Sequence, residues 1–272
     1  MTETAQTQTR RNRVPAAARA TTRRDRVRAA TVEEIKETAR RILVAEGIEG
    51  LSLRAIAREM GMTAPALYRY FPSREELIVA LIGDLYEELA DAMEAAAAAE
   101  PAADTAGQLA AVSREFRRWA VGHPREFGLL FGSPIPGVAV EKGTEDQPNP
   151  TAESSRRFGR VFGELVARIY LEKPFPIPAE DELDPELRKE LGHWAEELPT
   201  ELPVGLAQVF LSCWIRLYGT VAMEVFGHLA FAVADAGPVF EEELKDLSDL
   251  LGMEYRPPVA PASRQSATAE GR

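Results

Sequence analysis

The sequence feature that most constrains the fold is the segment 51–77. Within it, Ser52 precedes an apolar helical pattern that Gly61 ends, and Thr63 and Pro72 bound the helix that follows. Serine and threonine are favoured helix N-caps, and glycine supplies the left-handed backbone that a tight turn needs. The segment therefore predicts two short helices joined by a tight turn. Because neither helix is long enough to be stable alone, both must pack against neighbouring helices.

Helical patterns lie on both sides of this segment. Residues 31–34 read T-V-E-E and residues 73–76 read S-R-E-E, two capping boxes that each predict a helix start. The first of these helices is predicted to end at Gly47, and the second to extend through the alanine run 95–99. Sustained period-two alternation is absent from the sequence, so we predict an all-α chain. The further helices are predicted at 105–121, 124–132, 152–171, 184–197, 201–233 and 238–251.

Composition divides the chain into four parts. Residues 1–30 are rich in arginine and lack apolar periodicity, so they are predicted to form a disordered basic arm. Residues 31–78 form the predicted helical head, and residues 79–256 form a larger helical domain that contains a mobile loop at 133–150. Residues 257–272 are predicted to be a disordered tail.

Charge is distributed unevenly along the chain. Residues 1–74 hold 15 Lys and Arg against 8 Asp and Glu, whereas residues 75–272 hold 17 against 35, and the whole chain has a net charge of -11. A small basic head on an acidic body suits the binding of a polyanion at one end only. The acidic body would be repelled by the same polyanion, which helps to fix the orientation of binding.

Several other classes of protein are disfavoured. The apolar region 204–234 is interrupted by charged residues, so it is interpreted as a buried helix of a soluble protein and not as a membrane span. Residues 1–20 lack the apolar core of a secretory signal, and the lone Cys213 excludes an intramolecular disulfide, which together predict a cytoplasmic protein. The sequence has no phosphate-binding glycine loop, dinucleotide fingerprint or nucleophile elbow. We therefore predict no enzymatic activity and no cofactor.

Two stretches of the sequence resemble one known family. Residues 51–77, LSLRAIAREMGMTAPALYRYFPSREEL, together with the helix before them, resemble the helix-turn-helix head of the TetR family of bacterial transcriptional regulators. Residues 214–224, WIRLYGTVAME, are similar to a tryptophan- and glycine-containing helix in the C-terminal domain of that family. The resemblance implies a three-helix DNA-binding head, joined by a long fourth helix to a larger helical domain for ligand binding and dimerisation.

The layout of a helix-turn-helix places its second helix in the major groove of DNA, N-terminus first. Arg54 is long enough to reach a guanine edge, and the resemblance places a base contact there. Arg69 adds to base selection if it points inward, and DNA shape supplies further selectivity. The small side chains expected near thymine methyl groups are Ala64, Pro65 and Ala66. The phosphate contacts are expected from Ser52, Thr63, Tyr68, Tyr70 and Arg74.

The arginines of the basic arm have two alternative roles. They either enter the minor groove or only raise the non-specific affinity for DNA. The arm residues assigned to the DNA interface are Arg24, Arg26 and Arg28.

The acidic body carries aromatic residues at helical spacing, which form either plain core or the wall of an apolar cavity. The resemblance implies such a cavity, and its composition predicts a small-molecule inducer of apolar or aromatic character. The predicted ligand-binding residues are Phe116, Trp119, Phe127, Phe131, Phe158, Phe162, Tyr170, Trp214 and Tyr218.

A homodimer is expected, because one helix-turn-helix reads only a few base pairs and a palindromic operator offers two half-sites. As in the family, helices 201–233 and 238–251 of both subunits would form a four-helix bundle. Some of its apolar residues must also serve the core of each subunit. The predicted dimer residues are Leu206, Phe210, Val221, Val225, Phe226, Leu229, Leu244, Leu247 and Leu251.

The predicted function is that of a repressor which leaves a palindromic operator when a ligand changes the separation of the two recognition helices. One alternative is an activator or a ligand-independent regulator on the same fold. A second is a helical metal-binding enzyme that would use Glu190 with His193, or Glu224 with His228. Each of these pairs lacks the further ligands that a metal site needs, so we predict no bound metal.

Overall fold

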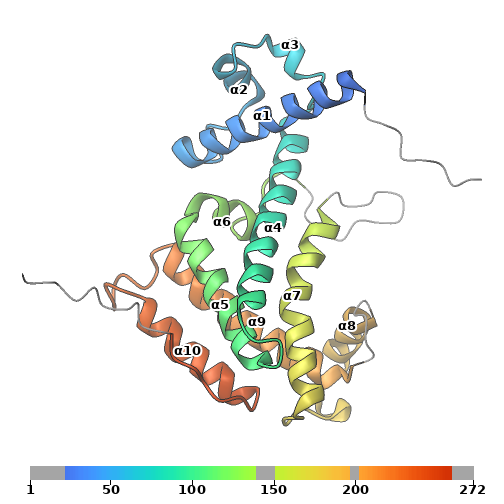
Figure 1. Ribbon diagram of the computed structural model, residues 1–272, viewed down its shortest axis with the longest axis vertical. Coiled ribbons are helices and arrows are strands. Elements are labelled where there is room, and N and C mark those ends of the chain that lie inside the picture. Colours follow the sequence, from blue (N-terminus) through green and yellow to red (C-terminus); the bar gives the residue numbers. More distant parts are fainter. Residues whose placement is uncertain (1–21, 139–150, 197–201, 259–272) are drawn as a thin grey trace, which may run out of the picture.

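The computed structural model of the protein describes residues 22–138, 151–196 and 202–258 (Figure 1). The elements in these residues are α1 (Arg23–Glu46), α2 (Leu53–Glu59), α3 (Ala64–Leu67), α4 (Arg74–Ala99), α5 (Thr105–Gly122), α6 (Pro124–Phe131), α7 (Ala152–Glu172), the 3₁₀ helix η1 (Glu180–Glu182), α8 (Pro185–Glu196), α9 (Val204–Val225) and α10 (Gly237–Leu250). None of the described residues forms a β-strand, which confirms the all-α fold. A head of three helices lies at one end of α4, and the other helices pack around the rest of α4 (Figure 1).

Helix α1 begins well before the predicted start at Thr31. Its N-cap is Thr22, whose hydroxyl accepts a hydrogen bond from Asp25 N at 3.2 Å, while the Asp25 carboxylate accepts one from Thr22 N at 3.0 Å. Thr31 lies inside the helix, and its hydroxyl donates to the Val27 carbonyl oxygen at 3.0 Å. The prediction failed because the earlier capping box is also complete and the arginines and alanines after it favour a helix.

The first turns of α1 therefore replace part of the predicted disordered arm. Arg23, Arg24, Arg26 and Arg28 all lie on this helix and are exposed. Residues 1–21, which make up the remainder of the predicted arm, lie outside the described residues. Most of the predicted loop and tail also lies outside them, at 139–150 and 259–272.

The turn between α2 and α3 is built as the sequence predicts. Ser52 is the N-cap of α2 and its hydroxyl accepts a hydrogen bond from Ala55 N at 3.2 Å. Gly61 has a φ of 65°, which is the left-handed conformation that the tight turn needs. Leu67 and Ile56 are fully buried beneath the turn and fix α3 against α2. Helix α3 ends at Leu67, earlier than the predicted end at Phe71, and turns continue to residue 70.

Helix α4 connects the head to the body without a break. Ser73 caps it, with its hydroxyl accepting from Glu76 N at 3.1 Å, and the helix extends to Ala99, just before Pro101. One face of α4 is buried at each turn from the head to the body, because apolar residues recur at helical spacing. The buried residues of this helix are Leu77, Ile78, Leu81, Ile82, Leu85, Tyr86, Leu89, Ala90 and Met93.

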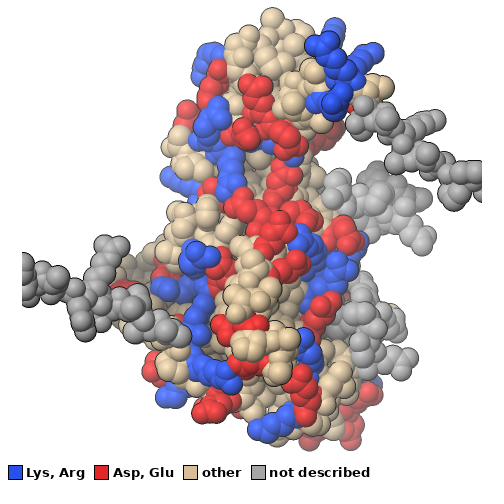
Figure 2. Space-filling model, viewed as in Figure 1, with Lys and Arg blue, Asp and Glu red and all other residues tan. Residues whose placement is uncertain are grey.

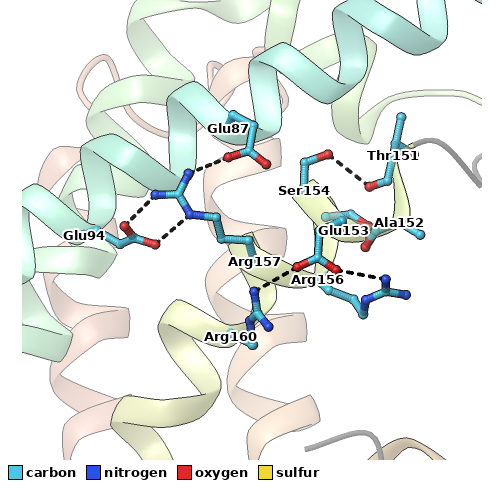
Figure 3. A network of polar contacts seen from close by, with 10 residues as sticks. Glu87, Glu94, Thr151, Ala152, Glu153, Ser154, Arg156, Arg157 and Arg160 are labelled. Carbon is cyan, nitrogen blue, oxygen red and sulfur yellow. Dashed lines mark hydrogen bonds and ion pairs between the residues drawn. The ribbon is translucent and has the colours of Figure 1, made fainter. Parts of the chain in front are cut away.

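The body packs α4 against α5 and α7, and α9 crosses behind them, flanked by α8 and α10 (Figure 1). Arg157 of α7 is placed among carboxylates of α4, as Figure 3 shows for Glu87 and Glu94. Its guanidinium lies 2.5 Å from a Glu87 carboxylate oxygen, 2.6 Å from one of Asp91 and 2.6 Å from one of Glu94. These ion pairs raise the pKa of Arg157 and tie α7 to two turns of α4.

The remaining helices agree with the sequence predictions to within three residues, except α9. This helix ends at Val225, and turns follow to residue 232, so the predicted extension to 233 is wrong. Gly227, with a φ of 74°, lies directly after the end of the helix, where glycine often stops an α-helix. By length and composition alone α9 could cross a membrane, and 33% of its apolar window is buried inside this chain.

Candidate DNA-binding surface and ligand cavity

The outer surface of the head gathers most of the predicted DNA contacts. Arg54 is exposed on α2 and makes no hydrogen bond or ion pair with another described residue, so its guanidinium is available to a partner. Tyr68, just after α3, keeps 47% of its surface exposed. Among the predicted contact residues of the head, the exposed ones are Ser52, Arg54, Thr63, Pro65, Tyr68 and Arg69, and the half-buried ones are Ala64, Ala66, Tyr70 and Arg74.

Helix α1 contacts the segment that follows α3. The Arg28 guanidinium lies over the Tyr70 ring, 5.1 Å from its centroid, and Arg28 Nη2 donates to the Arg69 carbonyl oxygen at 3.3 Å. A cation over an aromatic face is attracted by the ring quadrupole. Figure 2 shows Lys and Arg side chains gathered at the end of the head where α1 begins. The basic first turns of α1 are thus fixed beside the predicted recognition helix.

Arg74 has a structural role that the sequence did not predict. Its Nε donates to the Leu51 carbonyl oxygen at 2.7 Å, and its Nη2 donates to the Ile48 carbonyl oxygen at 2.7 Å. The side chain is half-buried and holds the start of α4 against the loop between α1 and α2. The predicted phosphate contact of Arg74 stays a prediction, because these two hydrogen bonds leave three of the five N–H groups of the guanidinium for a phosphate.

Seven of the predicted ligand-binding aromatic residues form one cluster in the body. Phe116 is fully buried at its centre, with ring centroids 5.9 Å from Phe131, 5.9 Å from Phe158 and 5.6 Å from Trp214. The Phe116 ring meets its neighbours at tilted or perpendicular angles, whereas Tyr218 stacks on Trp214 and Phe127. The members of the cluster are Phe116, Phe127, Phe131, Phe158, Phe162, Trp214 and Tyr218.

A cavity of about 460 Å³ borders one side of this cluster, between α4, the end of α6, α7, α8 and α9. Four of the predicted ligand-binding residues line it: Phe131, Phe158, Phe162 and Trp214. Its other lining residues are Tyr86, Gly159, Leu191, Phe210 and Leu211. A second, narrow cavity of about 40 Å³ lies between α5, α7, α9 and α10 and shares Phe162, Phe210 and Trp214 with the first. These three side chains therefore separate two apolar compartments.

Family models match both parts of the chain. The model described as bacterial regulatory proteins, tetR family, matches residues 35–81, and the model described as tetracyclin repressor-like, C-terminal domain, matches residues 109–247. The HTH-type transcriptional regulator Rv1816 of Mycobacterium tuberculosis is 33% identical over 229 residues, which are 80% of this chain and 91% of that protein. The chain belongs to the TetR family. It is a DNA-binding transcriptional regulator.

Further relatives agree with membership of the TetR family. The HTH-type transcriptional repressor DrrR1 of Streptomyces coeruleorubidus is 46% identical over 48 residues, 18% of each protein. The crystal structure of SCO4313 has a TM-score of 0.65 and is 33% identical, covering 83% of this chain and 98% of its own. A structure from Rhodococcus sp. RHA1, at 19% identity and a TM-score of 0.55, covers 81% of this chain and 92% of its own and shares the fold.

The TetR head model leaves the first turns of α1 unmatched. It begins at residue 35, whereas α1 begins at Arg23. The arginines at 23, 24, 26 and 28 therefore extend this TetR-family head beyond the matched part.

Two predicted ligand-binding residues of this TetR-family body, Trp119 and Tyr170, lie outside both the aromatic cluster and the cavity lining. Phe116, Phe127 and Tyr218 belong to the cluster but do not line the cavity either. Trp119 stacks on His123, with centroids 4.9 Å apart, and its Nε1 donates to Glu88 Oε1 at 2.9 Å. Tyr170 packs against Phe175, with centroids 5.2 Å apart. Both predictions are corrected, because helical spacing shows that a residue faces inward but does not show which neighbours it meets.

The structure reveals a polar junction between the TetR head and the body, which the sequence analysis missed. Arg40 of α1 forms two hydrogen bonds to the Glu88 carboxylate of α4, at 2.5 and 3.1 Å, and Arg40 Nε lies 3.2 Å from Glu126 Oε1 of α6. Trp119 of α5 binds the same Glu88 carboxylate. Burial alone would raise the pKa of Glu88, but the hydrogen bonds from Arg40 and Trp119 outweigh it and keep that pKa below its ordinary value.

The predicted dimer residues divide into two groups. Five of them pack inside one subunit and are at most 5% exposed: Leu206, Val221, Leu244, Leu247 and Leu251. These five belong to the part of the predicted set that serves the core of each subunit, where α9 packs against α5 and α10. Phe210 lines the ligand cavity, while Val225, Phe226 and Leu229 remain at least partly exposed near the end of α9.

Proposed function

We propose that this TetR-family protein is a homodimeric cytoplasmic repressor that leaves a palindromic operator when a small apolar or aromatic molecule binds in its body. The observation that carries the proposal is the course of α4. This helix starts at the head with Arg74 and passes the aromatic cavity at Tyr86. A ligand that binds one dimer geometry better than the other therefore acts on a helix that is continuous with the DNA-binding head.

The polar junction supplies a second connection between cavity and head. Phe116, at the centre of the aromatic cluster, and Trp119, in the junction, lie on consecutive turns of α5. Trp119 contacts Glu88, and Glu88 contacts Arg40 of the head. A displacement of α5 by a ligand would consequently be felt at α1 as well as along α4.

Exposed apolar surface on α9 and α10 supports a homodimer. On α9, Ile215 is 59% exposed and Met223 is 42% exposed, and Gly219 between them lies on the same helix face with open space beside it. On α10, Val239 is 36% exposed and Leu250 is 37% exposed. Soluble monomers rarely leave a large contiguous apolar patch uncovered. A second copy of the chain, related by a two-fold axis, would cover both helices.

The DNA contacts of the proposal follow from exposure and reach. Arg54 reads a base edge, Tyr68 contacts phosphate, and Ala64 to Ala66 pack close to the groove floor. Arg69 adds to base selection where it faces the groove, and Ser52, Thr63 and Tyr70 contact phosphate. Arg24, Arg26 and Arg28 act from an ordered helix beside α3, so they meet the DNA backbone next to the half-site.

The DNA part of the proposal is tested by selecting bound sequences from a random duplex pool at two salt concentrations. We expect an enriched palindrome whose affinity falls steeply with salt. Arg54→Ala should cost about 1–3 kcal/mol of specific binding and relax one base position. Equal loss on all sequences would show that Arg54 contacts only the backbone. A reporter behind the selected operator should be less active when the gene is present, and higher output would identify an activator instead.

The dimer is tested by analytical ultracentrifugation of two matched variants. Ile215→Glu places a charge in the proposed interface and should shift the protein toward the monomer at least about tenfold, because an unpaired buried charge is costly. Leu171→Glu is the control, since Leu171 is 64% exposed on α7, a helix that the proposed interface does not include. Equal dimerisation of both variants would place the interface elsewhere.

A further inference from the structure

The larger cavity has a lining that restricts its ligand. Aromatic faces dominate it, with Phe158 and Trp214 5.6 Å apart between centroids and Phe131 and Phe158 5.7 Å apart. The lining contains no Lys, Arg, His, Asp or Glu among the described residues. An ion that loses its hydration there would find no opposite charge, and burying an unpaired charge is strongly unfavourable. The cavity therefore favours a neutral molecule.

One polar group in the lining lacks a partner. Tyr86 is 7% exposed, its ring packs against Phe131 at 5.8 Å and Phe158 at 5.7 Å, and it lines the cavity. Within the part of the chain that the structure describes, its hydroxyl forms no hydrogen bond. The nearby Tyr218 hydroxyl, by contrast, donates to the Phe131 carbonyl oxygen at 2.8 Å. The Tyr86 hydroxyl is therefore free to donate a hydrogen bond to an acceptor on a ligand in the cavity.

The Tyr86 hydroxyl keeps its proton under all physiological conditions. Burial, together with the neighbouring Tyr218, raises the pKa of Tyr86 to about 12. The group is therefore available as a neutral hydrogen-bond donor, and a phenol donates well to a carbonyl oxygen. The flat aromatic walls beside it suit an aromatic ring system in offset or edge-on contact.

We propose that the effector is a neutral aromatic compound carrying a carbonyl or equivalent acceptor, with its ring system in the cavity against Phe131, Phe158 and Trp214 and its acceptor bound by the Tyr86 hydroxyl. This inference rests on the proposed ligand-binding function and makes it chemically specific. It also gives a role to a polar residue that interrupts the buried face of α4. Because Tyr86 belongs to α4, acceptor binding acts directly on the helix that carries the head.

The test is a competition experiment on the full-length protein. Nile red, a neutral aromatic fluorophore with one carbonyl, serves as the reporter of cavity occupancy. Four displacing compounds share a ring system and differ in one group: acetylnaphthalene, ethylnaphthalene, naphthoate and naphthyl-trimethylammonium. We expect the ketone to displace the reporter at about two- to tenfold lower concentration than the hydrocarbon, which corresponds to one hydrogen bond. Both ions should displace it least well.

Two variants assign the effect to one hydroxyl group. Tyr86→Phe removes only the unpaired hydroxyl and should bring the ratio between ketone and hydrocarbon to about one, with the melting temperature preserved. Tyr170→Phe is the control, because Tyr170 packs against Phe175 and lies outside the cavity lining. It should leave the ratio unchanged.

The outcomes separate this inference from the proposed function. Three results would each overturn the inference. They are a ketone-to-hydrocarbon ratio that Tyr86→Phe leaves unchanged, binding of either ion more tightly than the ketone, and no binding of Nile red. Operator binding is measured separately by gel shift. Binding that follows the expected order without release of DNA would support the ligand chemistry and overturn the induction mechanism.

Discussion

Replacing Arg40 by methionine removes the guanidinium that joins the head to the body and keeps most of the apolar stem. The guanidinium contacts two carboxylates, Glu88 of α4 and Glu126 of α6. Their surroundings differ. The Glu126 side chain is 5% exposed, whereas the Glu88 side chain is 39% exposed and also receives the hydrogen bond from Trp119.

The expected loss of stability follows from that difference. Removing one partner of a buried ion pair costs about 3–5 kcal/mol. Here Arg40 itself is 32% exposed, and water can solvate Glu88 once the guanidinium is gone. The unpaired Glu126 carboxylate therefore dominates, and we expect Arg40→Met to lower the free energy of unfolding by about 2–3 kcal/mol. Glu126→Gln alone should cost about 1 kcal/mol, because the amide remains polar but loses its charge.

The assay is a double-mutant cycle in urea, followed by tryptophan fluorescence at one fixed protein concentration, because the stability of a dimer depends on concentration. With Gln at position 126 no buried carboxylate is left unpaired, so the double variant should cost about 1–2 kcal/mol less than the sum of the single variants. Additivity to within about 0.3 kcal/mol would refute the reasoning and show that the pair adds nothing to stability.

Three further predictions concern other residues. Gly61→Val should lower the free energy of unfolding by about 1–2 kcal/mol and abolish operator binding, because a β-branched residue is strained at a φ of 65° even though no atom would crowd its Cβ. Circular dichroism melting and gel shift test this prediction, and Gly61→Asn, which tolerates a positive φ, is the control. The lowered pKa of Glu88 contributes stability at neutral pH, and this contribution is lost as the pH falls below 4.5. The difference in unfolding free energy between wild type and Glu88→Gln should therefore shrink below pH 4.5. A difference that stays constant with pH would contradict this prediction. Burial raises the pKa of Cys213 to about 11, so iodoacetamide at pH 8 should alkylate the folded protein at least about tenfold more slowly than the unfolded one.

Local sequence rules predicted the head accurately where one residue decides the geometry. Ser52 and Ser73 cap their helices and Gly61 adopts the left-handed turn, because these effects depend on atoms within a few residues. The same rules placed the start of α1 incorrectly. Two capping boxes compete there, and the box at Thr22 and Asp25 is the one that forms. A cap motif inside a segment of strong helix formers does not interrupt the helix.

The body shows where the sequence pattern stops being sufficient. Helical spacing identified the apolar residues of α9 and α10 but not their neighbours, so Leu206 and Leu244 were assigned to the dimer although they are buried within one subunit. Tyr86 could have been found, because it lies on the buried face of α4 between Leu85 and Leu89. The junction of Arg40 with Glu88 could not, since it joins residues 48 positions apart and depends on how the helices cross.

The unbroken course of α4 sets a scale for any movement of the head. Tyr86 follows Arg74 by twelve residues, which at 1.5 Å per residue places them about 18 Å apart along the axis. A tilt of about 5° at the cavity would thus move the head by roughly 1.6 Å, and opposite tilts in two subunits would change the spacing of the heads by about 3 Å. Successive major grooves on one face of DNA lie about 34–36 Å apart, and both heads must fit this spacing. A change of about 3 Å is comparable to the length of a hydrogen bond, so it would misplace the contacts in the second half-site. The tilt of α4 that causes it is small enough to leave the body packed.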